Sequence, residues 1–298
     1  MRLHRGVTTT LLTLTFAMAS ALPALAQKPA VAQKVTLGGR PTPGQTIRVS
    51  IVQDADLNMK PAEAAAGSPM GPMHLKAKTT TVVSQKVGTP DEKGAVHVDM
   101  TYEDISQNVT INDQPAPPEA AEAAAKIKGK TLSMIIDGSG EVIEVTPPAD
   151  FQMPTGMVKD MLKQAFGLMA RQEMSVGETV TTPFSMAMPI PMPGDPPQLK
   201  GEMKSTLTGV SGAAGTEAAA VEQIVTAAVD STMPAPGGNG DIGIKMQVTG
   251  KGSSDWDVKG ALVKASKMTT NIAGTLTIPG VGSMELTGVT IVSLDRVP

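Results

Sequence analysis

The chain of 298 residues contains no cysteine, and this absence excludes two kinds of structure. Without cysteine there are no disulfides, so the folded state must be stabilised by a packed core. There is also no thiol that could be acylated behind a signal peptide, which argues against a lipoprotein anchor. We therefore expect the stability of the protein to come from hydrophobic burial.

Aromatic residues are also scarce, at 2% of the chain, whereas methionine occurs 20 times. The core must therefore be filled by valine, isoleucine, leucine, alanine and methionine. Methionine adapts to irregular gaps but specifies a single packing arrangement poorly. We expect a stable core with some looseness.

The chain carries little excess charge, with a net charge of −3, and few residues suited to catalysis. A mildly acidic chain lacks the basic patches that bind nucleic acid, so nucleic acid is not an expected partner. Two histidines lie beyond the N-terminal region: His97 is on the polar side of an alternating run, and His74 has no acidic or serine partner nearby in the sequence. No serine hydrolase, zinc protease or phosphate-loop motif is present. We expect neither an enzyme nor a bound cofactor.

Residues 1–26 have the features of a secretory signal peptide. Arg2 and Arg5 form the charged end, Val7–Leu22 is an apolar run diluted by threonine and serine, and Ala24–Ala26 is an A-x-A cleavage site. The run is too short and too polar for a membrane span, and no other segment is apolar enough for one. Cleavage after Ala26 leaves 272 residues and changes the net charge from −3 to −5, because two arginines are removed. We expect an exported protein, periplasmic or extracellular, and the lack of cysteine favours a bacterial source.

The stretch Lys251–Ile278 shows the pattern that predicts the fold. Asp257 and Gly260 fit the first and fourth positions of a type I turn whose last residue is left-handed, which predicts a hairpin. Every second residue near the end of the stretch is apolar or glycine: Ile272, Gly274, Leu276 and Ile278. The residues between them are polar or small, as in a strand with one buried face and one wet face.

The chain also contains signs of an internal duplication. The same D-x-x-G turn begins at Asp91, Asp137 and Asp257, and the motif G-[QE]-T-[IV] occurs at Gly44–Ile47 and Gly177–Val180. These landmarks follow one another in the same order in both halves. We interpret residues 27–150 and 176–298 as two pseudo-repeated β-meanders within one structural domain.

Between the repeats, residues 151–175 form a connection that contains one amphipathic helix, which we place at Thr155–Arg171. Its apolar residues recur at three- and four-residue spacing: Met157, Val158, Met161, Leu162, Ala165, Phe166, Leu168 and Met169. A helix with such a face must lie on a sheet, either as plain core or as a mobile lid. The predicted fold class is mainly β: a curved, half-barrel-like antiparallel sheet built from two pseudo-repeats, with the helix packed on it.

A curved sheet with an apolar helix on its concave face can hold an apolar ligand such as a lipid or acyl chain. The expected ligand-binding residues are those of the helix stripe: Met157, Met161, Leu162, Phe166 and Met169. The expected function is therefore non-catalytic, the binding of an apolar small molecule or of an envelope protein.

The signal peptide, the long meander strands and the single amphipathic helix together resemble the periplasmic lipoprotein carriers of the LolA/LolB kind, in which a half-barrel sheet covers a lid helix. The chain departs from these carriers in its length, because of the duplication. The D-x-x-G hairpins and the repeated G-[QE]-T-[IV] motif also look like exported bacterial families of unknown function. This second resemblance spans most of the mature chain and implies no site residues.

Methionine-rich segments support a different function, the binding of Cu(I). Thioethers and imidazole are the soft ligands that select this ion, and the candidate ligands are Met70, Met73, His74, Met186, Met188 and Met192. Methionine also replaces the missing aromatics at ordinary strand positions such as Met100, Met134 and Met246. A Cu(I)-binding protein is thus the alternative function, and an enzyme of unknown type is the third.

We predict that the exported protein begins at Gln27 or Gln33, because a second A-x-A site, Ala30–Ala32, closely follows the first. Intact-mass spectrometry of protein recovered from the periplasm or the medium measures the terminus. A membrane-bound product that keeps Met1 would contradict both the localisation and the carrier function.

Overall fold

The computed structural model describes residues 34–38, 41–62, 71–117, 125–148, 156, 158–160, 162–163, 171–188, 196–213, 215–235 and 240–298. The expected signal peptide, residues 1–26, lies outside these ranges. Within them β-strands form almost all of the regular structure. The strands are β1 (Lys34–Leu37), β2 (Thr46–Pro61), β3 (Met73–Pro90), β4 (Val96–Ile111), β5 (Gln114–Pro115), β6 (Thr131–Ile136), β7 (Val142–Thr146), β8 (Gln172–Ser175), β9 (Thr179–Ala187), β10 (Gln198–Ser211), β11 (Ala218–Pro234), β12 (Asp241–Asp257), β13 (Leu262–Ile278) and β14 (Gly282–Arg296).

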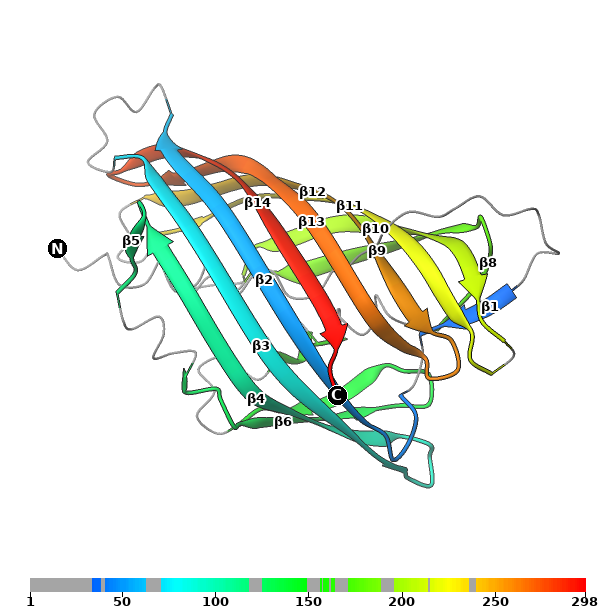
Figure 1. The fold of residues 1–298 in the computed structure, drawn as a ribbon. Helices are drawn as coiled ribbons and strands as arrows, with labels where there is room; N and C mark the ends of the chain where they lie inside the picture. The colour runs from blue at the N-terminus through cyan, green and yellow to red at the C-terminus, as the bar shows by residue number, and fades with distance from the viewer. Residues whose placement is uncertain are drawn as a thin grey trace.

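One large antiparallel sheet dominates the fold (Figure 1). Its strand order is β7-β6-β4-β3-β2-β14-β13-β12-β11-β10-β9, and the short β5 pairs with β4 beside this path. From β2 to β4 and from β9 to β14, strands that follow one another in the chain are neighbours in this sheet, and so are β6 and β7; the last strand, β14, pairs with β2. The prediction of a mainly β protein with a large antiparallel sheet is confirmed.

Strands β1 and β8 form a separate two-stranded antiparallel sheet, in which Lys34 pairs with Ser175. The apolar side of this small sheet packs against the large one, in a buried cluster of Val35, Leu37, Met174, Leu207, Ala219, Val221 and Trp256. The predicted helical connection, residues 151–175, ends in a strand, β8, that the sequence does not indicate. A four-residue strand is too short to show a clear periodic pattern.

All three D-x-x-G segments lie between paired strands, as predicted. In the first two, the Asp91 and Asp137 carboxylates each accept two backbone N–H bonds, and the fourth residues, Gly94 and Gly140, are left-handed at φ +81° and +96°. The third turn differs, since the left-handed residue is Ala261 and not Gly260. The prediction for Gly260 is therefore wrong.

The reason is the length of the loop. Asp91 N–H bonds to the carbonyl of Ala95, four residues ahead, whereas Asp257 pairs with Leu262, five residues ahead. The extra residue moves the left-handed position one place along the chain.

The long strands bury one face of the large sheet, which we call the inner face. It is defined by one row of directly paired residues, which share a face: Met203, Val225, Gly250, Thr270, Thr290, Ala55, Ala77 and Val109. In β13, Asn271 and Thr275 on the opposite, outer face are exposed, whereas Ile272 and Leu276 are partly buried. The predicted alternation of this strand is confirmed.

Methionine contributes to the inner face throughout the sheet. The methionines with an exposed fraction below 9% are Met59, Met100, Met134, Met174, Met188, Met203, Met233, Met246, Met268 and Met284. All of them lie on the inner face or in the clusters packed on it. The interpretation that methionine takes core positions in place of aromatic residues is confirmed for these residues.

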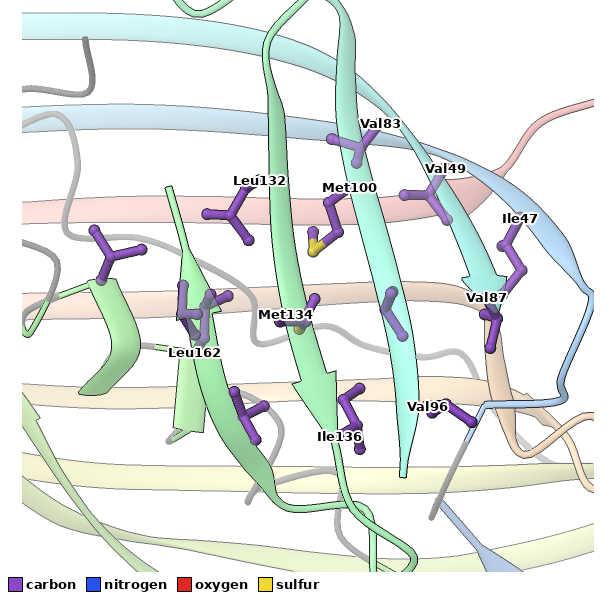
Figure 2. Packing of buried hydrophobic residues seen from close by; sticks show 14 residues of the cluster. Ile47, Val49, Val83, Val87, Val96, Met100, Leu132, Met134, Ile136 and Leu162 are labelled. Atoms are coloured by element: carbon purple, nitrogen blue, oxygen red, sulfur yellow. The ribbon is translucent and has the colours of Figure 1, made fainter. Parts of the chain in front are cut away.

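Residues 156, 158–160 and 162–163 are helical, within the predicted helix Thr155–Arg171. Val158 and Leu162, one turn apart, are 4% and 9% exposed and belong to a cluster with Leu132 and Met134 of β6 (Figure 2). The prediction of a helix whose apolar residues lie on the sheet is confirmed for these positions. Among the described residues, no helix is long and apolar enough to cross a membrane.

Substitution of the buried helix residue Leu162 tests whether the helix is part of the core or a mobile lid. If the helix is plain core, Leu162→Ala should lower the free energy of unfolding by about 2–5 kcal/mol, since a large buried side chain is removed. Lys163→Ala is the control: its Nζ lies 3.0 Å from Glu141 Oε1 in an exposed ion pair, whose loss should cost less than about 1 kcal/mol. Denaturant melts measure both changes. Equal, small losses for the two variants would mean that the helix is a mobile lid.

Candidate functional site on the inner face

The inner face has two apolar ends. The first, which we call the helix end, contains the clusters around Val98, Met134 and Trp256, and is covered by the helix residues and by β1 and β8. The second, which we call the far end, contains two clusters of buried residues: Met188, Leu199, Ala227, Val229, Met233, Ile244 and Met246 in one, and Ala55, Leu57, Leu75, Ala77 and Val109 in the other.

The two far-end clusters are continuous. Ile272 of β13 and Leu286 of β14 are partly buried and pack against both of them. Among the described residues, these clusters consist of sheet side chains together with Met188 and Ala116, which directly follow β9 and β5. The far end is therefore one apolar surface that extends from β10 across the sheet to β4.

A band of small and polar residues crosses the inner face between the two ends, and we call it the polar band. Its members come from eight neighbouring strands and are Gln107, Thr79, Gln53, Thr290, Thr270, Ser266, Gly250, Gly252, Ser254, Gln223 and Ser205. Within the described parts of the polar band and the far end, the inner face carries no Asp, Glu, Lys or Arg. The middle of the sheet is therefore uncharged, with polar side chains beside the buried apolar cluster of Met203, Val225 and Met268.

Only part of this polarity is satisfied within the protein. Trp256 Nε1 donates to Ser254 Oγ at 2.9 Å, and Gln223 Nε2 donates to Met203 Sδ at 3.7 Å. The side-chain oxygens Ser266 Oγ and Gln223 Oε1 are buried and have no hydrogen-bond partner. Each such atom costs about 1–3 kcal/mol of stability unless a water molecule or ligand bonds to it.

Glycines bring neighbouring backbones close together on the inner face. A Cβ at Gly252 would lie 2.6 Å from the Lys267 carbonyl oxygen, and one at Gly288 would lie 2.5 Å from that of Asp56. A Cβ at Gly274 would overlap the carbonyl of Lys245. Glycine at these positions permits the close approach of the strands. Side chains of the neighbouring strands lie over two of them: Met268 Sδ is 3.1 Å from where a Cβ of Gly252 would stand, and Leu57 Cδ2 would overlap a Cβ at Gly288.

Charges lie on the outer face. Asp54 and Asp56 of β2 face Lys78 and His74 of β3, with His74 Nε2 2.7 Å from Asp56 Oδ1. Sequence analysis missed this partner of His74 because it lies 18 residues away and is brought close only by strand pairing. His97 is exposed on the outer face, as predicted.

At the helix end, burial raises the pKa of the Tyr102 phenol, which keeps this side chain neutral.

The structure places only one of the predicted ligand-binding residues, Leu162, which lies in the buried cluster of the helix end. Met157, Met161, Phe166 and Met169 lie outside the described residues. The polar band was not anticipated at all. In the sequence, the polar band corresponds to serine, threonine, glutamine and glycine at strand positions that are expected to be buried. Within any single strand, such residues look like ordinary variation.

Strand pairing does not bring together the described candidates for Cu(I). Met73 lies on the inner face of β3, whereas its neighbour His74 points to the outer face. Met186 and Met188 belong to β9 and the residue just after it, and β9 lies seven positions from β3 in the sheet. Met70 and Met192 lie outside the described residues. In the part of the chain that the structure describes, no three His, Cys, Asp or Glu side chains are grouped to hold a metal ion.

Two solved structures are distantly similar to this chain. No family model and no curated protein matches the chain. A solved structure of lipovitellin, reported for its lipid–protein interactions, is similar over 87% of this chain at 9% sequence identity and a TM-score of 0.48; the chain spans only 26% of that protein. An outer membrane channel from Pseudomonas putida F1 is similar over 94% of this chain and 98% of its own, at 9% identity and a TM-score of 0.20. Both TM-scores are low, and neither likeness indicates a function for this chain.

Proposed function

We propose that this is a non-catalytic exported protein that binds an apolar ligand, a lipid or an acyl chain, on the inner face of its large sheet. One observation carries the proposal: the far end is a continuous apolar surface, without charge in its described part, that crosses the sheet from β10 to β4. An apolar surface of this kind with a few polar groups beside it is typical of small-molecule sites.

The side chains of the far end are of a kind that can change their packing to accommodate an apolar ligand. Met59, Met233, Met246 and Met284 all lie on this part of the inner face. Methionine has three rotatable bonds and a polarisable sulfur, so it adjusts its shape to an apolar chain at little cost. Leu286 and Ile272 are only partly buried and connect the two far-end clusters, so they are the residues we assign to ligand contact.

We also propose that the sheet is curved in a half-barrel-like way, concave toward the inner face. The close approaches at Gly252, Gly274 and Gly288 all occur on that face, and glycine in a strand interior often marks a bend. A concave inner face would contact an elongated ligand over more of its surface than a flat one. The same arrangement agrees with the resemblance to periplasmic lipoprotein carriers.

The two meanders that form the curved sheet are proposed to be repeats. Gly44 N–H bonds to Val87 and Gly177 N–H bonds to Leu207, at 3.0 and 2.7 Å, and both glycines are left-handed. Each turn leads into the first strand of its meander, β2 or β9. Identical turn geometry at the two copies of the G-[QE]-T-[IV] motif supports a duplication.

Ile272→Thr tests the function, with Ile224→Thr as the matched control. Ile272 lies on the inner face, whereas Ile224 is 47% exposed on the outer face of β11. Titration with the uncharged apolar dye Nile red should show binding to the wild type and an affinity about fivefold or more lower for Ile272→Thr, because a buried hydroxyl without a partner costs about 1–3 kcal/mol. Ile224→Thr should bind as the wild type does.

Solvent extraction of the purified protein, followed by lipid mass spectrometry, should recover an apolar molecule from the wild type. A wild-type protein that neither binds Nile red nor carries a lipid would refute the proposed function. An equal loss of dye binding in the two threonine variants would refute the assignment of the inner face.

A further inference from the structure

Ser266 of β13 is one of four described residues with a buried side-chain oxygen that has no hydrogen-bond partner; the others are Gln45, Gln223 and Ser253. Ser266 is 8% exposed, lies on the inner face, and its Oγ makes no hydrogen bond. Its direct neighbour on β12, Ser254, is already bonded to Trp256 Nε1. A hydroxyl group that is buried without a partner destabilises the folded state, and a water molecule or a ligand that bonds to it would restore the lost hydrogen bond.

Gln223 supplies a second unused oxygen in the same part of the polar band. It lies on β11 and pairs with Gly252 of β12, which in turn pairs with Met268 of β13. Gln223 Oε1 is buried without a partner, and its Nε2 bonds only to the Met203 sulfur, a weak acceptor. Gly252 has no side chain of its own, and the Met268 sulfur lies over it, 3.1 Å from where a Cβ at this position would stand.

The surroundings restrict the ligand group that these oxygens would bind. The described inner face carries no charged residue in the polar band or at the far end. Moving an ionised group into such surroundings is very unfavourable, whereas a neutral hydroxyl, ester or amide needs only hydrogen-bond partners. Ser266 Oγ both donates and accepts, and Gln223 Oε1 accepts.

The polar band lies next to the apolar far end along the same strands. From Ser266, the inner face of β13 continues through Met268 and Thr270 to Ile272 and Leu276. On β12 it continues from Gly252 and Gly250 to Val248, Met246 and Ile244. A molecule whose polar group reaches Ser266 would therefore place its apolar chain along the strands at the far end.

We propose that the ligand is an uncharged amphiphile whose hydrogen-bonding group binds Ser266 and Gln223 while its apolar chain covers the far end. This inference rests on the proposed function and specifies the class of ligand. It excludes ionised fatty acids and lipids whose charged headgroup would have to enter the polar band.

Displacement of Nile red by three probes of equal chain length tests the ligand class. The probes are dodecanol, dodecane and dodecanoate, the last of which is ionised at about pH 8. Wild-type protein should bind dodecanol about tenfold or more tightly than either of the others, because only dodecanol has a neutral group that satisfies the buried oxygens. Dodecanoate that binds as tightly as dodecanol would overturn the inference.

Ser266→Ala and Gln223→Leu test the residues, with Ser293→Ala on the outer face of β14 as the control. Each of the first two should weaken dodecanol binding by about threefold to tenfold and leave dodecane binding unchanged. Ser266→Ala should also be at least as stable as the wild type in a denaturant melt, since it removes an unsatisfied hydroxyl group. Ser293→Ala should leave dodecanol and dodecane binding unchanged.

If Nile red binds but the preference for dodecanol survives both inner-face substitutions, this inference is wrong and the proposed function stands. If the wild type binds no Nile red, the proposed function is wrong and the inference falls with it.

Discussion

The pairing of β14 with β2 is the interaction on which the rest of the structure depends. Thirteen residue pairs, from Met284 with Pro61 to Arg296 with Val49, join the end of the second meander to the start of the first. This antiparallel pairing makes one sheet out of two, with β7 and β9 at the two ends of its strand order. It also makes the inner face continuous, because Leu286 and Gly288 meet Met59 and Leu57 across the junction.

Once the sheet is continuous, the alternation of strand residues separates two surfaces. The outer face carries the ionisable groups, which form exposed cross-strand pairs such as Lys60 with Glu285. The inner face carries methionines and aliphatic residues, with the polar band between its two apolar ends. Among the described residues four buried side-chain oxygens lack a hydrogen-bond partner, and two of them, Ser266 Oγ and Gln223 Oε1, lie together in that band. Violations of an otherwise consistent pattern are expected at functional sites, which is why the proposed ligand is placed there.

Much of the fold could be predicted because its signals are local. Alternation with a period of two reveals which side of β13 is buried, and an aspartate followed by a glycine three residues later reveals the hairpins. The apolar stripe of the helix likewise predicts the burial of Val158 and Leu162. The abundance of methionine with few aromatics predicts a methionine-filled core. Each of these inferences requires only a short run of consecutive residues.

The sequence by itself therefore determined the strand character, the turns and which side of each element is apolar, because these follow from the chemistry of near neighbours. Only the tertiary structure decided which strands pair and which residues face one another across the pairs. The register places Asp56 beside His74, lengthens the third hairpin so that Ala261 becomes left-handed, and pairs β1 with β8. It also brings Ser266 within two strands of Gln223, which is 43 residues earlier in the chain. Pairing between distant strands depends on the whole set of backbone hydrogen bonds and buried contacts, and no single segment contains that information.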